Sequence, residues 1–121
     1  MRALIVDSSA SLRDKLISLL SDVPDLHIIG EASTWDETLH LFRNLQIEIA
    51  IVDIHVLKAP EIQSIQHLKS SHPQVHLISL SPVFTPEYDY AYRKAGADRV
   101  FDKSVGIEKV VEWLTDLHKK K

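Results

Sequence analysis

The sequence predicts an α/β fold in which helices cover both faces of a doubly wound, parallel β-sheet. Two observations lead to this prediction. Short apolar runs rich in β-branched residues alternate with longer stretches of helical period. These runs are apolar along nearly their whole length, which is typical of parallel strands buried on both faces. Because crossovers between parallel strands are right-handed, few other arrangements suit such a chain. With 121 residues, the chain is expected to form one domain over residues 1–121.

The first half of the chain is expected to form three strands, at residues 3–6, 27–29 and 47–52. The residues that close these strands are, in order, Asp7, Gly30 and Asp53. A helix between the first two strands has its apolar residues on one face, namely Leu12, Leu16, Ile17, Leu19 and Leu20. The next helix begins with Thr34 and Glu37, which form a capping box in which each side chain satisfies a free backbone donor.

The second half is expected to form two strands, at residues 75–80 and 99–101, and three helices. Pro60 and Glu61 suit the first turn of the third helix. Thr85 suits the N-cap of the fourth helix, which stops before Gly96. The last helix has its apolar residues on one face: Ile107, Val110, Val111, Leu114 and Leu117. The basic tail at 119–121 is open to three interpretations: a solvated end, part of a linker, or a weak electrostatic docking element.

The composition excludes several classes of protein. The chain has no cysteine, which excludes disulfide scaffolds, thiolate zinc sites, iron–sulfur clusters and cysteine nucleophiles. Its net charge of −3 argues against binding to nucleic acid or to a membrane surface. The sequence has no Gly-rich nucleotide-binding loop, and no apolar run long enough for a signal peptide or a membrane span. We therefore expect a soluble, cytoplasmic domain without nucleic-acid or membrane partners.

Polar side chains follow several of the expected strands. In an open parallel sheet, ligands bind beyond the carboxyl ends of the strands, near the point where strand order reverses. If the order is 2-1-3-4-5, Asp7 and Asp53 face each other, Ser81 flanks Asp53, and Lys103 reaches in from the edge. Two carboxylates so close repel each other unless a cation lies between them, which is Lys103, a metal ion, or both. Singly, each residue also has an ordinary structural explanation, as a helix cap, a turn residue or a solvated charge.

Four short motifs lie at these strand ends: Leu-Ile-Val-Asp at 4–7, Ile-Val-Asp at 51–53, Leu-Ser at 80–81 and Phe-Asp-Lys-Ser at 101–104. A fifth motif, Ala-Gly-Ala-Asp at 95–98, precedes the last strand. Through these motifs the chain resembles a response-regulator receiver domain of two-component signalling over its whole length. The resemblance implies the flavodoxin-like (βα)5 fold, with a five-stranded sheet in the order 2-1-3-4-5. It also implies that Asp53 is the phosphoacceptor, that Lys103 contacts the phosphoryl group, and that Ser81 hydrogen-bonds to it.

The resemblance further implies an Mg²⁺ site formed by Asp7, Asp53 and the backbone carbonyl of His55. Members of the family usually carry two adjacent acidic residues after the first strand, whereas here Ser8 takes the place of the second. A neutral hydroxyl contributes little against the hydration shell of the ion, so we expect weak binding. The His55 side chain would hinder or assist water attack on an acyl phosphate, or would simply be an exposed loop residue.

The chain departs from the family pattern at three further places, of which one, Ser104 after Lys103 in place of the common Pro, is a variation also found in the family. Residues 54–61 lack the usual Pro-Gly loop, and Val100 stands where the family has an aromatic residue that reports activation. Phe101 is adjacent but should point to the opposite face of the sheet. Two interpretations follow: a working receiver with weak metal dependence, or a degenerate receiver that binds proteins independently of phosphorylation. The retention of Asp53, Ser81 and Lys103 favours the working receiver.

The expected reaction is self-catalysed transfer of a phosphoryl group to Asp53 from a histidine kinase, a phosphotransfer protein or a small donor, followed by hydrolysis of the acyl phosphate. This is at most a limited form of enzymatic activity. A downstream protein is expected to bind the face formed by the fourth helix, the fifth strand and the fifth helix. Two other classes stay open: a small-molecule α/β enzyme or flavin protein, and a fragment of a longer DNA-binding regulator.

Overall fold

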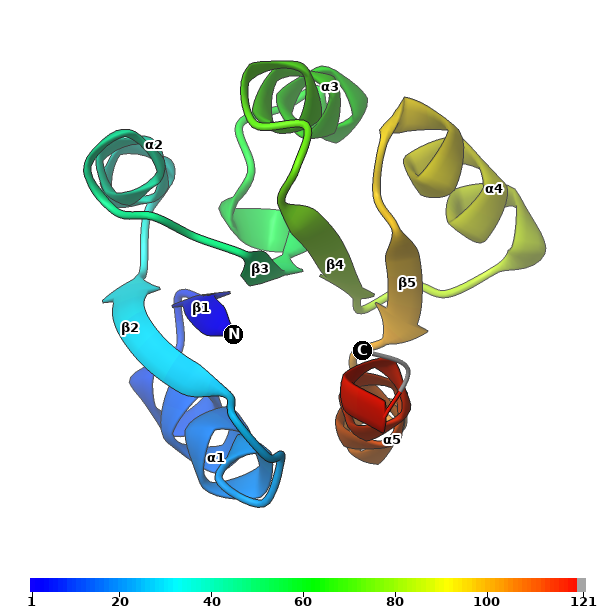
Figure 1. The fold of residues 1–121 in the computed structure, drawn as a ribbon. Coiled ribbons are helices and arrows are strands. Elements are labelled where there is room, and N and C mark those ends of the chain that lie inside the picture. The colour runs from blue at the N-terminus through cyan, green and yellow to red at the C-terminus, as the bar shows by residue number, and fades with distance from the viewer. Residues whose placement is uncertain (120–121) are drawn as a thin grey trace.

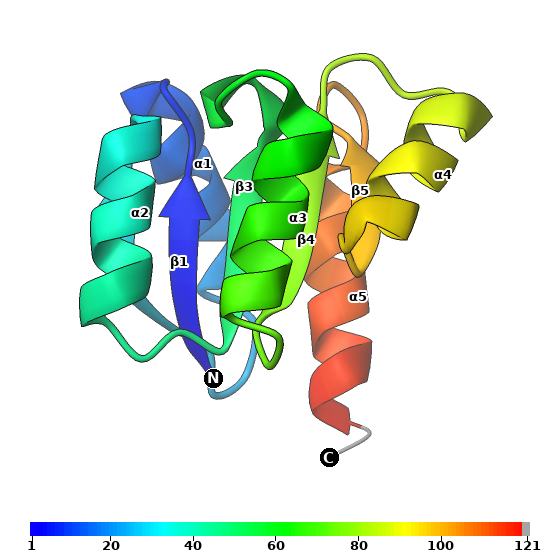
Figure 2. The ribbon, with the colours of Figure 1, turned by 90° about the horizontal axis from the view of Figure 1, so that it is seen from above.

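The computed structural model describes residues 1–119, which form a five-stranded parallel sheet between two layers of helices (Figures 1 and 2). The strands are β1 (Arg2–Val6), β2 (His27–Ala32), β3 (Ile49–Asp53), β4 (His76–Ser81) and β5 (Arg99–Asp102). The helices are α1 (Ala10–Leu20), α2 (Trp35–Asn44), α3 (Glu61–Ser71), α4 (Pro86–Ala95) and α5 (Ile107–Lys119), with a 3-10 turn, η1 (Ile54–Val56), after β3. The order β2-β1-β3-β4-β5 confirms the predicted fold class.

Residues 120 and 121 of the basic tail lie outside the described part of the chain, so only Lys119 of that tail is placed, at the end of α5. Within residues 1–119, no helix has the length and apolarity that crossing a membrane requires.

Alternate residues of each strand enter two separate cores, one on each face of the sheet. Helices α2, α3 and α4 cover one face, and α1 and α5 cover the other (Figure 1). From β1, Leu4 and Val6 join the core under α2–α4, whereas Ala3 and Ile5 join the core under α1 and α5. Because both faces are covered, β3 is buried along its whole length, which explains why the strands are apolar almost throughout.

Strand β2 continues past Gly30 to Ala32, so the prediction that Gly30 closes this strand was wrong. Gly30 pairs with Leu4 just after a shift in register between β1 and β2. A Cβ atom at Gly30 would lie 3.2 Å from Leu45 Cδ1 and 3.3 Å from Leu4 Cδ1. The glycine therefore marks a place where side chains pack closely over a strand, not the end of that strand. Strands β3 and β4 also end one residue later than expected.

The predicted helix caps are largely present. Thr34 Oγ1 accepts a hydrogen bond from Glu37 N at 3.1 Å, as the capping box requires. The Glu37 carboxylate, however, accepts from the backbone N and the hydroxyl of Ser33, at 3.1 and 2.6 Å, rather than from the backbone N of Thr34. These hydrogen bonds from Ser33 lower the pKa of Glu37. Thr85 caps α4, and Pro60 lies at the N-cap of α3, one position before the expected first turn.

The Ala-Gly-Ala-Asp segment joins three elements at the end of the sheet opposite the carboxyl ends of the strands. Lys69 Nζ of α3 lies 2.9 Å from Asp98 Oδ2 and donates to Val75 O at 2.8 Å. The same carboxylate accepts from Leu77 N at 2.7 Å. Gly96 ends α4 with a φ of 131°, and a Cβ there would lie 2.8 Å from Lys69 Cβ. Only glycine combines this backbone conformation with so close a contact.

We expect Gly96→Ala to lower the free energy of unfolding by about 2–4 kcal/mol, because it adds both backbone strain and a steric clash. Urea denaturation of the two proteins measures the difference. Gly30→Ala is the matched control, with an expected loss of about 1 kcal/mol or less, since only the flexible ends of two leucine side chains must move there. Equal losses in the two variants would contradict this explanation.

Candidate functional site

The carboxyl ends of β1, β3 and β5 bring three charged side chains together. In the parallel register Val6 pairs with Val52, so the next residues, Asp7 and Asp53, lie side by side. Both side chains are only 1% exposed. Lys103 follows β5, and its Nζ lies 2.8 Å from Asp53 Oδ2 and 3.1 Å from Asp7 Oδ2. The structure thus gathers three of the residues that the sequence singled out into one cluster.

Lys103 supplies the cation between the two carboxylates. Its backbone N donates to Ser81 O at 2.9 Å, which holds the start of the loop after β5 against β4. Partial burial disfavours its ammonium, but the hydrogen bond to Asp53 and the negative charges of Asp53 and Asp7 outweigh this effect and raise the pKa of Lys103. One ammonium against two carboxylates leaves one net negative charge in the cluster, which favours the approach of a further cation.

Backbone N–H groups hold the Oδ1 atoms of both carboxylates, whereas Asp7 Oδ2 has no hydrogen bond. Asp53 Oδ1 accepts from His55 N at 3.2 Å, and Asp7 Oδ1 accepts from Ser9 N at 2.9 Å. Ser9, not Asp7, is the N-cap of α1. Asp7 Oδ2 is buried and close to Lys103 Nζ, yet it receives no well-aligned hydrogen bond. Such an unsatisfied buried oxygen keeps its capacity to accept a hydrogen bond or to bind a cation.

Ser81 lies at the end of β4 and is buried, but its hydroxyl does not join the cluster. Ser81 Oγ donates to Val83 O at 2.5 Å, within the loop between β4 and α4. A cavity of about 200 Å³ lies beside it, lined also by the exposed His55 and by Tyr88 and Tyr92 of α4. Asp53 pairs with Leu80, so Ser81 lies one residue beyond that pair, and its hydroxyl bonds to the loop and not to Asp53.

The aromatic ring near this cavity comes from α4 rather than from β5. Val100 packs in the core under α2–α4 and Phe101 packs under α5, which confirms that Phe101 points to the opposite face. Tyr92 shares the core of Val100, and its ring stacks on Tyr88 with centroids 5.7 Å apart. Burial, then the charge of Glu61 and then Tyr88, raises the pKa of Tyr92. The helical spacing of the tyrosines was visible in the sequence, but their different burial was not.

The oxygen donors suit a weakly held divalent cation. Within residues 1–119, the structure brings together no group of three or more His, Asp or Glu side chains that could hold a metal ion. Asp7 and Asp53 provide two carboxylates, which are ligands that Mg²⁺ accepts together with water. The unsatisfied Oδ2 of Asp7 fits such an ion. Ser8, at the predicted position of the missing acidic ligand, is exposed and neutral.

Arg13 contacts the backbone at the end of β1, a role that the sequence did not predict. From α1, its Nη1 donates to Asp7 O at 2.6 Å and its Nε donates to Glu31 Oε1 of β2 at 3.1 Å. Arg13 therefore ties the end of β1 to α1 and β2. Nothing in the helical period distinguishes this arginine from a solvated one, since both contacts are to residues of other elements.

We expect Lys103→Met to lower the free energy of unfolding at neutral pH by about 3 kcal/mol, since it leaves two buried carboxylates without a cation. Because the pKa of Lys103 is raised, its contribution is complete below the ordinary lysine value of 10.5 and is lost only as pH rises through the raised pKa. Urea denaturation measures the effect, with Lys15→Met on the exposed face of α1 as control. Adding Asp7→Asn to Lys103→Met should restore part of the loss; unchanged stability of Lys103→Met would contradict the argument.

Response regulators are similar to this chain in sequence. No family model matches the chain. The response regulator GacA of Pseudomonas viridiflava is 22% identical over 114 residues, which cover 94% of this chain and 53% of that protein. An uncharacterized response regulatory protein of Vibrio cholerae is 30% identical over an alignment of 126 residues, covering 99% of this chain and 51% of that protein. The chain spans about half the length of these relatives.

Solved structures share the fold over the whole chain. The isolated REC domain of RcsB from Salmonella enterica serovar Typhimurium, with the phosphomimetic BeF3−, has a TM-score of 0.89 at 18% identity and covers 100% of this chain and 90% of that one. The receiver domain of the Francisella response regulator 1452 has a TM-score of 0.83 at 17% identity, covering 98% and 97%. Relatives in sequence and neighbours in fold thus agree, and the chain is a receiver domain of the response-regulator type.

Proposed function

We propose that this domain, residues 1–121, accepts a phosphoryl group on Asp53 in two-component signalling. The observation that supports the proposal most directly is the position of Asp53, buried at the end of β3 with Lys103 Nζ at 2.8 Å and Asp7 beside it. A carboxylate paired with an ammonium is a suitable nucleophile and acceptor for a phosphoryl group, because the ammonium offsets the negative charge of the phosphoryl oxygens.

In the proposed reaction an oxygen of Asp53 attacks the phosphorus of the donor. The bond from phosphorus to the donor nitrogen of a phosphohistidine, or to the donor oxygen of a small acyl phosphate, breaks, and its electron pair leaves with the donor. Asp53 becomes an acyl phosphate, which water later hydrolyses. Lys103 stabilises the charge on the phosphoryl oxygens. Ser81 donates a hydrogen bond to the same group once its hydroxyl turns from Val83 O.

Asp7 and Asp53 are the residues that would hold Mg²⁺, with the backbone carbonyl of His55 as a further oxygen ligand. When bound, this ion supplies positive charge to the phosphoryl oxygens. The unsatisfied Oδ2 of Asp7 and the net negative charge of the cluster support the assignment. With Ser8 in place of a third carboxylate, the affinity for the ion is low.

The donors in this proposal are a histidine kinase, a phosphotransfer protein or a small phosphoryl compound. The downstream partner is a protein that contacts the face of α4, β5 and α5. The exposed apolar side chain of Val105, 69% exposed in the loop before α5, supports that choice. A conformational change at Ser81 would reach this face through the loop that it holds.

We expect incubation with acetyl phosphate and Mg²⁺ to add the mass of one phosphoryl group to the protein, and Asp53→Asn to abolish the addition. Intact-mass spectrometry checks both results. Asp22→Asn, an exposed carboxylate between α1 and β2, is the control and should still be phosphorylated. Labelling of the Asp53→Asn protein would contradict the assignment of the acceptor. The complete absence of labelling with acetyl phosphate and with phosphoramidate would favour a phosphorylation-independent binding module instead.

We expect Ser8→Asp to tighten Mg²⁺ binding by about tenfold or more, because it adds a hard, charged oxygen ligand beside Asp7. Titration calorimetry with MgCl2 measures the dissociation constants. Ser11→Asp adds the same charge to an exposed position of α1 and separates local ligation from the general effect of charge. If the two variants bind the ion equally well, Ser8 does not face the metal position.

A further inference from the structure

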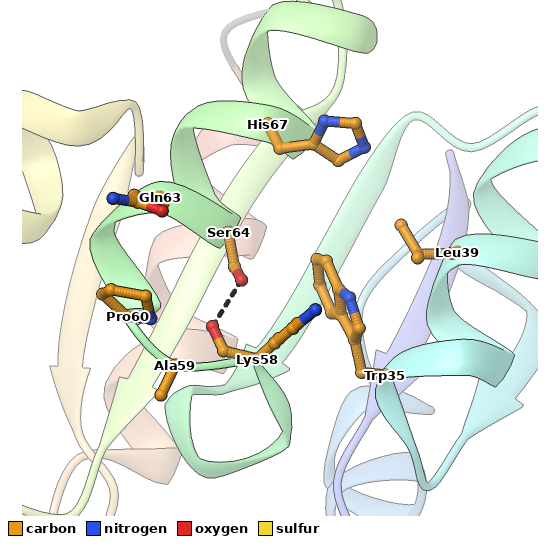
Figure 3. A pocket seen from close by; sticks show the side chains of 8 residues that line it. All are labelled: Trp35, Leu39, Lys58, Ala59, Pro60, Gln63, Ser64 and His67. Atoms are coloured by element: carbon orange, nitrogen blue, oxygen red, sulfur yellow. Dashed lines mark hydrogen bonds between the residues drawn. The ribbon is translucent and has the colours of Figure 1, made fainter.

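A second cavity lies between α2, α3 and the loop that follows η1, on the face of the sheet opposite α1 and α5 (Figure 3). Its volume is about 270 Å³. Helix α2 contributes Trp35 and Leu39, α3 contributes His67, and the loop contributes Lys58 and Pro60. This loop belongs to residues 54–61, where the chain departs from the family pattern, and the proposed chemistry at Asp53 uses neither Lys58 nor Pro60.

The lining combines the aromatic ring of Trp35 with two basic residues, Lys58 and His67, and has no acidic side chain to pair with them. Figure 3 shows the Lys58 side chain extending toward the indole of Trp35, with His67 on the α3 side of the same space. None of the lining residues is acidic. Within residues 1–119, Lys58 forms no ion pair, although the chain as a whole has a net charge of −3. The cavity is therefore complementary to a ligand that is apolar on one side and anionic on the other.

The main chain that carries Lys58 is held in place before any ligand arrives. Ser64 is buried, and its hydroxyl donates to Lys58 O at 2.6 Å, the hydrogen bond drawn in Figure 3. Pro60 O accepts from the backbone N of Gln63 at 3.0 Å and from that of Ser64 at 3.3 Å. A loop ordered in this way loses little further conformational freedom when a ligand binds.

We propose that this cavity binds an aromatic carboxylate, with the ring against Trp35 and Leu39 and the carboxylate paired with Lys58. The volume is slightly below the range of about 300–1,000 Å³ typical of small-molecule sites, so it suits a single ring and not a nucleotide or flavin. A ring with a nearby carboxylate occurs in free aromatic acids and in the C-terminal aromatic residue of a protein. The proposal does not depend on phosphorylation of Asp53.

The test follows the indole N–H signals of the ¹⁵N-labelled protein during titration with phenylacetate. The chain has two tryptophans, and Trp35→Phe assigns the two signals. We expect the Trp35 signal to shift with a dissociation constant of about 10 mM or tighter, while the Trp113 signal stays in place. Lys58→Gln should weaken binding by about fivefold, the upper range for an exposed ion pair. Lys15→Gln, which removes an exposed charge from α1, should leave binding unchanged.

Two further kinds of probe complete the test: a ligand of opposite charge, and a peptide that presents the carboxylate at its C-terminus. Benzylammonium has a similar ring with the opposite charge and should not bind. A peptide ending in a phenylalanine carboxylate identifies a protein C-terminus as the source if it binds and its C-terminal amide does not. Binding of phenylacetate without the peptide identifies a free acid. The proposal is overturned if neither acid shifts the Trp35 signal, if benzylammonium binds equally well, or if Lys58→Gln keeps full affinity.

Discussion

The pairing of two buried carboxylates with one ammonium is the interaction on which the functional edge of this domain depends. Parallel pairing of β1 and β3 places Asp7 and Asp53 side by side, where their charges repel. Lys103 offsets part of that repulsion, and its own charge is stabilised by both partners. The excess negative charge that remains lowers the stability of the folded state and, in the proposed function, attracts a cation.

The loops around this cluster are connected to it by hydrogen bonds to the backbone. Lys103 N donates to Ser81 O, and the Ser81 hydroxyl donates to Val83 O, so β5, β4 and the loop before α4 form one continuous path. Arg13 links the end of β1 to β2 in a similar way. These hydrogen bonds connect Lys103, which pairs with Asp53, to the loop before α4.

The opposite end of the sheet has a different character. There Asp98 joins α3, β4 and the start of β5 through Lys69 and the backbone of Leu77, and Gly96 permits close contact between α4 and α3. The Asp98 carboxylate in these contacts has both a cation and a backbone donor as partners. The domain thus combines a firmly packed amino-terminal edge of the sheet with an electrostatically unbalanced carboxyl-terminal edge, which is where ligands bind in open parallel sheets.

The sequence by itself determined the fold class, the strand order through family resemblance, and the meeting of Asp7, Asp53 and Lys103. These follow from local periodicity and from the rule that parallel strands end at the same edge of a sheet. Only the tertiary structure decided that β2 continues through Gly30, that Arg13 contacts the Asp7 backbone, that the Ser81 hydroxyl turns to Val83, and that Tyr92 is buried. The physical reason is that each depends on the local geometry of a loop or on contacts between residues distant in the chain, and the periodicity of a single segment contains neither.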